Sequence, residues 1–164
     1  MITDKGANKT AIAQLKLDIS YEAARGTFQI HIHKLKGLMN YANMDVFVKV
    51  SIAPDQAKTE VCVIRFKPVM QLKINNFFFP QKKTKSVNFG GKPLDFDEII
   101  EYRYAIGEVQ RKSLVLQLYQ DMSMGQVNSK NKPILLAQVT IGFSSTQGAN
   151  FSWSDWYSLF QPKK

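Results

Sequence analysis

The sequence contains very little cysteine: Cys62 is alone among 164 residues. A single cysteine excludes an internal disulfide and fits a reducing compartment. Runs of roughly 18 apolar residues, the length that a membrane-spanning helix needs, are also missing. The first ten residues, "MITDKGANKT", lack the apolar core of a secretory signal. These absences predict a cytoplasmic protein without a transmembrane segment.

Acidic residues are scarce, and one stretch has almost none. The chain has 22 Lys and Arg against 13 Asp and Glu, a net charge of +9. Between 58 and 92 the only acid is Glu60, so this stretch carries seven of the nine net charges. Its basic residues are Lys58, Arg65, Lys67, Lys73, Lys82, Lys83, Lys85 and Lys92. Such a cluster favours an anionic partner, namely acidic lipid, nucleic acid or an acidic protein, over a solvated face that binds nothing.

The apolar residues alternate with polar ones over most of the chain. Alternating runs extend over Leu15 to Tyr21, Phe28 to Ile32, Val46 to Val50, Leu114 to Leu118 and Val139 to Phe143. Strict alternation places one side of a segment on a core and the other in water, as in antiparallel strands. Turn signals separate the runs at Arg25-Gly26, Pro54-Asp55, Gly90-Gly91, Gly107 and Asn131-Lys132-Pro133. The pattern predicts an all-β antiparallel sandwich that ends in an aromatic strand, "SDWYSLF".

The segment from Glu60 to Pro80 is apolar and basic together, and it fits either an extra hairpin or a strand followed by a short helix. It ends in "NNFFFP", with Phe77, Phe78 and Phe79 in succession. Consecutive residues of a strand face opposite sides, so at least one of these rings would be exposed. We favour rings that cover an open end of the sandwich. The alternative is a docking site for a partner or a membrane, in which Arg65, Lys67 and the three rings make the contact.

Several motifs taken together resemble a C2 domain. "DVFVKVSIAPD" is similar to the family's Asp-Pro-Tyr-Val-Lys-Val…Leu-Pro-Asp, and "KTKSV" precedes Pro93 and "FDE" much as in the family. The likeness extends from about Leu15 to Leu159, in the strand order of synaptotagmin. The sequence also resembles the C2 domains of class II phosphoinositide 3-kinases. Departures are Val46 in place of proline and Lys92 in place of asparagine.

The resemblance implies an eight-stranded antiparallel β-sandwich. It places a tail at 1–12, the C2 domain at 13–164 and an insertion at about 56–80, between strands 3 and 4.

Calcium-binding C2 domains use five aspartates from two loops, because calcium needs several hard oxygen ligands. The resemblance assigns one of the five to Asp45, but Gln120 and Met122 occupy two other ligand positions. The first loop, "LMNYANM", has no aspartate, and Asp121 should point away on its strand end. We therefore expect a calcium-independent domain, in which Asp45 is a remnant that caps a turn.

In C2 domains that bind phosphoinositides, lysines of the third and fourth strands contact the phosphates. The resemblance assigns this role to Lys49, Lys83 and Lys85, while Ser51 replaces a family lysine. Lys83 and Lys85 are two apart and share a face if the strand is regular, whereas Lys82 points the other way. The predicted function is peripheral docking on anionic, phosphoinositide-containing membrane. The alternative is a protein-interaction C2 domain that binds an acidic partner.

Other functions find less support in the sequence. Asp97 and Glu98 are adjacent and should face opposite sides of a strand, so they form no acid–base pair. Neither the serines nor Cys62 have a base to activate them, and Gly90-Gly91 lacks phosphate-loop spacing. We expect no enzyme, no cofactor and, without aromatics interleaved among the lysines, no nucleic-acid binding.

His31 and His33 share a strand face, but a metal site would need two more ligands, from Cys62 or scattered carboxylates. We therefore expect a solvent-facing pair and no metal.

Overall fold

The computed structural model describes residues 10–38, 44–54, 81–90, 92–122, 132–143 and 150–162. The predicted insertion at 56–80, with Arg65, Lys67 and Phe77 to Phe79, lies outside these residues. The described strands are β1 (Ala11–Glu22), β2 (Thr27–Gly37), β3 (Met44–Pro54), β4 (Gln81–Lys83), β5 (Val87–Phe89), β6 (Leu94–Arg103), β7 (Lys112–Gln120), β8 (Ile134–Gly142) and β9 (Phe151–Phe160). One short helix, α2 (Ile106–Val109), lies between β6 and β7.

The strands form where the sequence alternates. In β1, Leu15, Leu17 and Ile19 are fully buried while their neighbours are partly exposed, so one face of the strand supplies the core. The alternation in β2, β3 and β7 has the same consequence. This confirms the predicted all-β class. β1 begins at Ala11, before the predicted domain boundary at residue 13.

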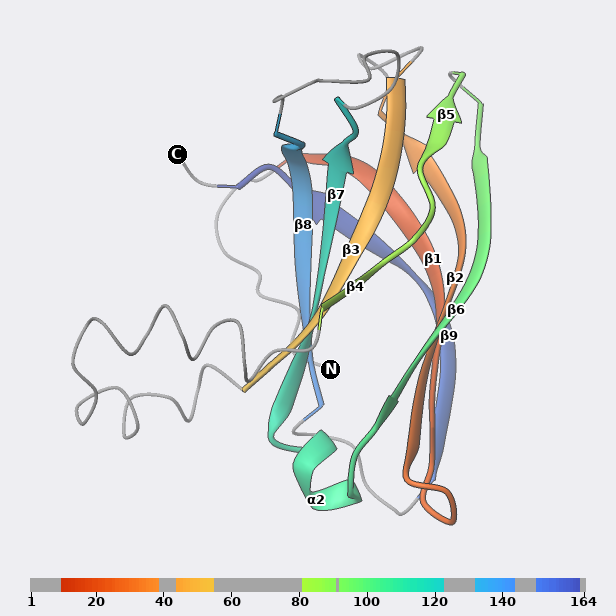
Figure 1. Cartoon of the computed structure of the whole chain (residues 1–164), viewed down its shortest axis with the longest axis vertical. Coiled ribbons are helices and arrows are strands. Elements are labelled where there is room, and N and C mark those ends of the chain that lie inside the picture. Colours follow the sequence, from red (N-terminus) through yellow and green to blue (C-terminus); the bar gives the residue numbers. More distant parts are fainter. Residues whose placement is uncertain are drawn as a thin grey trace, which may run out of the picture.

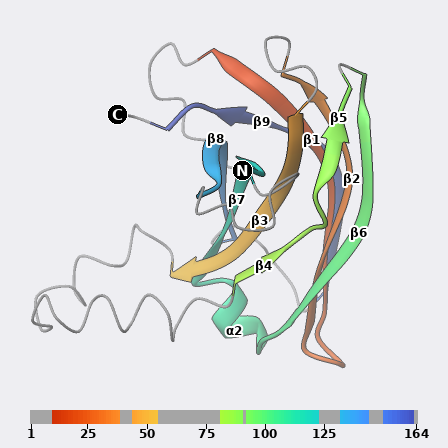
Figure 2. The ribbon, with the colours of Figure 1, turned by 45° about the horizontal axis from the view of Figure 1, so that its top comes forward.

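Two antiparallel layers face each other across the core (Figure 1). One layer has the order β4-β3-β7-β8 and the other β9-β1-β2-β6. A single register pair, Gln138 with Phe160, joins β8 to β9 and connects the layers. Figure 2 shows β3, β7 and β8 on one side and β1, β2 and β6 on the other, with α2 at one end.

The predicted fourth strand is present but interrupted. β4 and β5 both pair with β3, in registers that differ by one residue: Lys49 is opposite Lys83, whereas Val46 is opposite Val87. Thr84, Lys85 and Ser86 on one side therefore face only Phe47 and Val48 on the other, which is a β-bulge. Counting β4 and β5 as one strand, the eight-stranded antiparallel sandwich is confirmed.

A buried phenol connects the two layers. Tyr102 of β6 is 5% exposed, and its hydroxyl donates a hydrogen bond to the Val50 carbonyl of β3 at 3.2 Å. Burial raises the pKa of the Tyr102 phenol well above its ordinary value, with a smaller contribution from the neighbouring Tyr104. The hydroxyl therefore stays protonated and able to donate at neutral pH.

Candidate functional site

Lys49 and Lys83 lie directly opposite each other on β3 and β4. Their side chains extend from the sheet face away from the core, because Val48 and Val50, the neighbours of Lys49, are fully buried. Opposed residues of an antiparallel pair have Cβ atoms only about 5 Å apart, so these like charges repel. Within the described ranges no carboxylate pairs with either ammonium group. The structure thus brings two of the three predicted lysines together as an unneutralised pair.

Lys85 lies beyond the bulge, and its position depends on Thr84. Thr84 is 2% exposed; its backbone N–H donates to the Val48 carbonyl at 2.9 Å, and its Oγ1 accepts from the Val48 N–H at 3.0 Å. The hydroxyl thereby replaces the carbonyl that a regular strand would offer. Lys83 and Lys85 flank this buried residue and are both exposed. The premise of a regular strand was wrong, although both lysines remain on the surface.

A carboxylate lies beside the backbone of Lys85. The N–H of Lys85 donates to Oε1 of Glu98 at 2.8 Å. This negative charge offsets part of the local positive potential, so Lys49 and Lys83 form the more strongly basic part of the face.

An aromatic pair borders the lysine pair. Phe47 is 6% exposed and stacks on Tyr119 with ring centroids 5.4 Å apart and an interplanar angle of 10°. The Lys83 ammonium lies 5.0 Å from the centre of the Phe47 ring, within cation–π range. Our sequence analysis missed this contact. The available signal was the two-residue spacing of Phe47 and Lys49, which places both on the outer face.

Lys82 points to the opposite side, as predicted. It pairs with the core-facing Val50, and its ammonium donates to the Glu101 carbonyl of β6 at 2.5 Å. It also lies 5.0 Å from the Tyr102 ring. Lys82 therefore spans from β4 to the other sheet and is not part of the basic face.

Asp45 and Asp121, the two carboxylates that the sequence left near the calcium-ligand positions of the family, both accept hydrogen bonds. Oδ1 of Asp45 accepts from Nδ2 of Asn88 at 3.1 Å, and the Asp121 carboxylate accepts from the Ser86 hydroxyl. Asp45 lies within β3 and pairs with Asn88 across the strands, so its predicted role as a turn cap was wrong. The neighbouring segments 39–43 and 123–131 contain no aspartate or glutamate in the sequence.

The two histidines also differ from expectation. His31 and His33 are only 28% and 26% exposed, and their ring centroids lie 3.8 Å apart. Nε2 of His31 is 2.7 Å from Oδ1 of Asp97, and Nε2 of His33 is 2.6 Å from Oδ2 of Asp18. Both rings lie on the outer face of β2 and are partly exposed, and the carboxylate beside each ring is the feature that the sequence did not predict.

Asp18 is held in its charged form. The Ser154 hydroxyl opposite it on β9 lowers the pKa of the Asp18 carboxyl, burial raises it, and His33 lowers it further, so the net shift is downward. No hydrogen bond of normal geometry reaches its buried Oδ1, even from Ser154.

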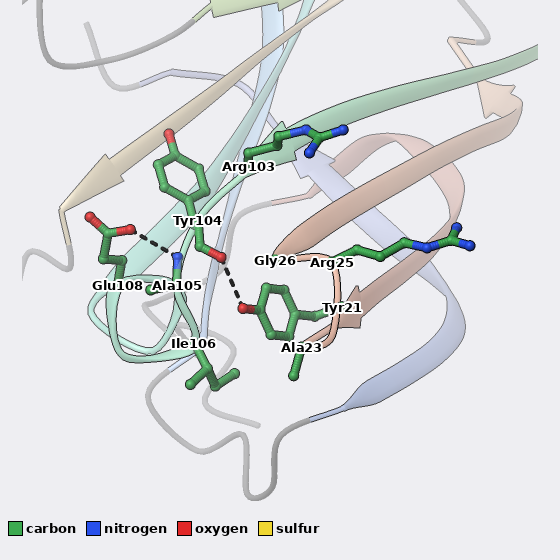
Figure 3. A pocket seen from close by; sticks show the side chains of 9 residues that line it. All are labelled: Tyr21, Ala23, Arg25, Gly26, Arg103, Tyr104, Ala105, Ile106 and Glu108. Carbon is green, nitrogen blue, oxygen red and sulfur yellow. Dashed lines mark hydrogen bonds between the residues drawn. The ribbon is translucent and has the colours of Figure 1, made fainter.

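A hollow of about 550 Å³ lies where the β1–β2 turn meets α2 (Figure 3). Its polar groups hold this corner together. The Tyr21 hydroxyl donates to the Tyr104 carbonyl at 2.9 Å, and Glu108 accepts from the Ala105 N–H at 2.9 Å. None of the predicted lysines lines the hollow.

No described helix has the length and apolar character needed to cross a membrane.

Comparison with known proteins gives matches in structure alone. No protein-family model and no curated protein matches the chain. The third C2 domain of the KIAA1228 protein has a TM-score of 0.65 at 21% identity, covering 98% of this chain and 96% of that one. A C2 domain of RIM from Drosophila has a TM-score of 0.62 at 14% identity, covering 92% and 99%. The first C2 domain of human synaptotagmin XIII has a TM-score of 0.58 at 12% identity, covering 97% and 93%. The chain has the fold of a C2 domain.

Proposed function

We propose that this C2 fold is a non-catalytic module that docks on anionic, phosphoinositide-containing membrane from the cytoplasmic side, without calcium. The observation that carries the proposal is the opposed pair Lys49 and Lys83, which no described carboxylate neutralises. Two lysines at directly opposed strand positions repel each other and gain most from an anion that binds both. A phosphate headgroup supplies such an anion, and the exposed Lys85 extends the same surface.

The aromatic neighbours support a defined site over diffuse attraction. The Lys83 ammonium lies over the Phe47 ring, and Tyr119 stacks on that ring. Restricting a long side chain before binding lowers the entropy lost when a ligand arrives. The lysine pair therefore offers phosphate a partly preorganised contact.

An acidic protein is the second candidate. The basic residues Lys58, Arg65, Lys67 and Lys73 lie within 55–80, outside the lysine pair, in the segment that also contains Phe77 to Phe79. A partner that binds this segment would need both charge and aromatic contacts.

Replacing Lys83 and Lys85 by alanine should weaken binding to phosphoinositide liposomes roughly thirtyfold, because each basic side chain near an anionic surface contributes about 1 kcal/mol. Lys49→Ala with Lys83→Ala should weaken it at least as much, since it removes the opposed pair. Binding should also fall steeply with added salt. The measurement is co-sedimentation in chelator across headgroups.

The matched control is Lys163→Ala with Lys164→Ala, which removes the same charge near the chain end. Equal losses in all three double variants would show that net charge, and no particular face, holds the protein to the liposome. Failure of the unmodified protein to bind at low salt would favour the acidic-protein candidate.

Calcium at millimolar concentration should leave the melting temperature of the protein nearly unchanged. Asp45 and Asp121 already accept hydrogen bonds, and two carboxylates are too few for a calcium site. A ligand stabilises the native state only in proportion to its binding. Differential scanning fluorimetry checks this, and a rise of several degrees would contradict it.

A further inference from the structure

The half-buried histidine pair belongs to a group of potential metal ligands contributed by β1 and β2. One ligand atom from each of Asp18, His31 and His33 can be chosen so that all three lie within 4.8 Å of one another. This is the only such group among the described residues. It lies on the sheet that does not carry the lysine pair, so it is independent of the proposed membrane function.

Strand register and a bulge bring these side chains together. Asp18 is directly opposite His31. The register between β1 and β2 shifts between Lys16 and Leu17, so His33 is an extra residue without a partner on β1. A second irregularity in the β2–β6 pairing contains Asp97, which adopts φ +48 and places its carboxylate 2.7 Å from His31. A left-handed backbone is uncommon outside glycine, although aspartate tolerates it better than most residues.

The donor atoms have the chemistry of a zinc site. Imidazole nitrogen and carboxylate oxygen bind Zn²⁺ at about 2.0–2.2 Å, which separates tetrahedral ligands by about 3.4 Å. The contact between His33 and Asp18, now 2.6 Å, would open slightly to admit the ion. The other two separations, neither longer than 4.8 Å, would also have to adjust to about 3.4 Å. Both adjustments are within reach of side-chain rotation.

Two further features favour an ion over a simple pair of hydrogen bonds. Oδ1 of Asp18 is buried, and no hydrogen bond of normal geometry reaches it, which is unusual for a carboxylate oxygen. The three side chains also remain partly exposed, at 28% for His31, 26% for His33 and 41% for Asp18, which leaves a path for the ion and a coordination position for water.

We propose that Asp18, His31 and His33 form a surface site for a divalent transition-metal ion such as Zn²⁺, with water as the fourth ligand. The two imidazoles favour Zn²⁺, Ni²⁺ or Cu²⁺ and disfavour Ca²⁺ and Mg²⁺, which require oxygen ligands. Asp97 lies beside the site as the hydrogen-bond partner of His31.

The test is titration of the full chain, first stripped with chelator, with ZnCl₂ by calorimetry and by melting temperature. At a hundredfold excess of free zinc over Kd, the melting temperature should rise roughly 5–10 °C. His31→Gln, His33→Gln and Asp18→Asn should each raise Kd at least about tenfold, the smallest loss typical when even a hydrogen-bond partner of a metal ligand is removed. Cys62→Ser is the control, because cysteine is the other residue type that binds zinc strongly and Cys62 is the only cysteine in the sequence. This variant should leave Kd unchanged.

A measurement on the unmodified protein covers the case in which a variant fails to fold. Substoichiometric Cu²⁺ should broaden the amide NMR signals around Asp18, His31 and His33 before all others. Loss of zinc binding in Cys62→Ser, unchanged Kd in both histidine variants, or broadening centred elsewhere would each overturn the proposal. So would absence of zinc binding by the unmodified protein.

Discussion

Gly37→Ala is expected to destabilise the domain by roughly 2–6 kcal/mol, a large part of the stability of a typical domain. Gly37 ends β2 with φ +96, a conformation that is strained for alanine. An added Cβ would lie 2.9 Å from the Cα of Ala13 and 3.0 Å from the Ile12 carbonyl oxygen. Both are backbone atoms of the paired strand, so they cannot move aside alone. Urea unfolding followed by tryptophan fluorescence measures the loss.

Gly90→Ala provides the control, because a Cβ at Gly90 would meet no atom within 4 Å. That variant should be neutral or slightly stabilised, by up to about 1 kcal/mol. If Gly37→Ala lost no more stability than Gly90→Ala, the close approach of β1 and β2 at this point would be incorrect.

Phe28→Ala should lower the free energy of unfolding by about 3–5 kcal/mol, through lost burial and the cavity that remains. Phe28 is 1% exposed and meets the Phe143 ring edge-to-face, with centroids 5.1 Å apart. Phe151 is 6.4 Å away and stacks on Trp153 at 4.9 Å. Calorimetry gives the stability, and Trp153 fluorescence reports loosening of the same cluster.

Ile99→Ala is the matched truncation at the surface, where the side chain is 60% exposed. It should change stability by no more than about 0.5 kcal/mol. A loss in Phe28→Ala as small as that in Ile99→Ala would contradict the described packing between the two sheets.

The sequence was sufficient for the fold because alternation records burial directly. Leu15, Leu17 and Ile19 all serve the core, and apolar residues that recur at every second position indicate a strand with one buried face. The family motifs then supplied the strand order, which short-range alternation does not contain. The family resemblance also placed Lys49 and Lys83 on the third and fourth strands, but only the register of the structure shows that they lie opposite each other.

The details of the site depended on contacts that alternation does not encode. At the bulge beyond Lys83, the Thr84 hydroxyl accepts the hydrogen bond that a backbone carbonyl would accept in a regular strand. The letters "KTK" do not show whether the threonine side chain takes this role. His31 meets Asp97 across 66 residues of sequence, and that meeting depends on strand order and on an irregularity in β6. Asp45 looked like a turn residue because its neighbours in the family lie in a loop, yet here it is part of β3.

Lys82 has a consequence for how this protein behaves at high concentration. β4 and β6 are the outermost strands of the sheet path, and outermost strands offer unpaired backbone groups to any other chain. The Lys82 ammonium, carried by β4, donates to the Glu101 carbonyl on β6, so a charged group occupies one backbone acceptor at the place where the two strands approach. A second molecule that added a strand there would have to displace and desolvate this lysine. Lys82 thus makes strand addition at this point less favourable, and Lys82→Val would remove that charge without altering the lysine pair on the opposite face.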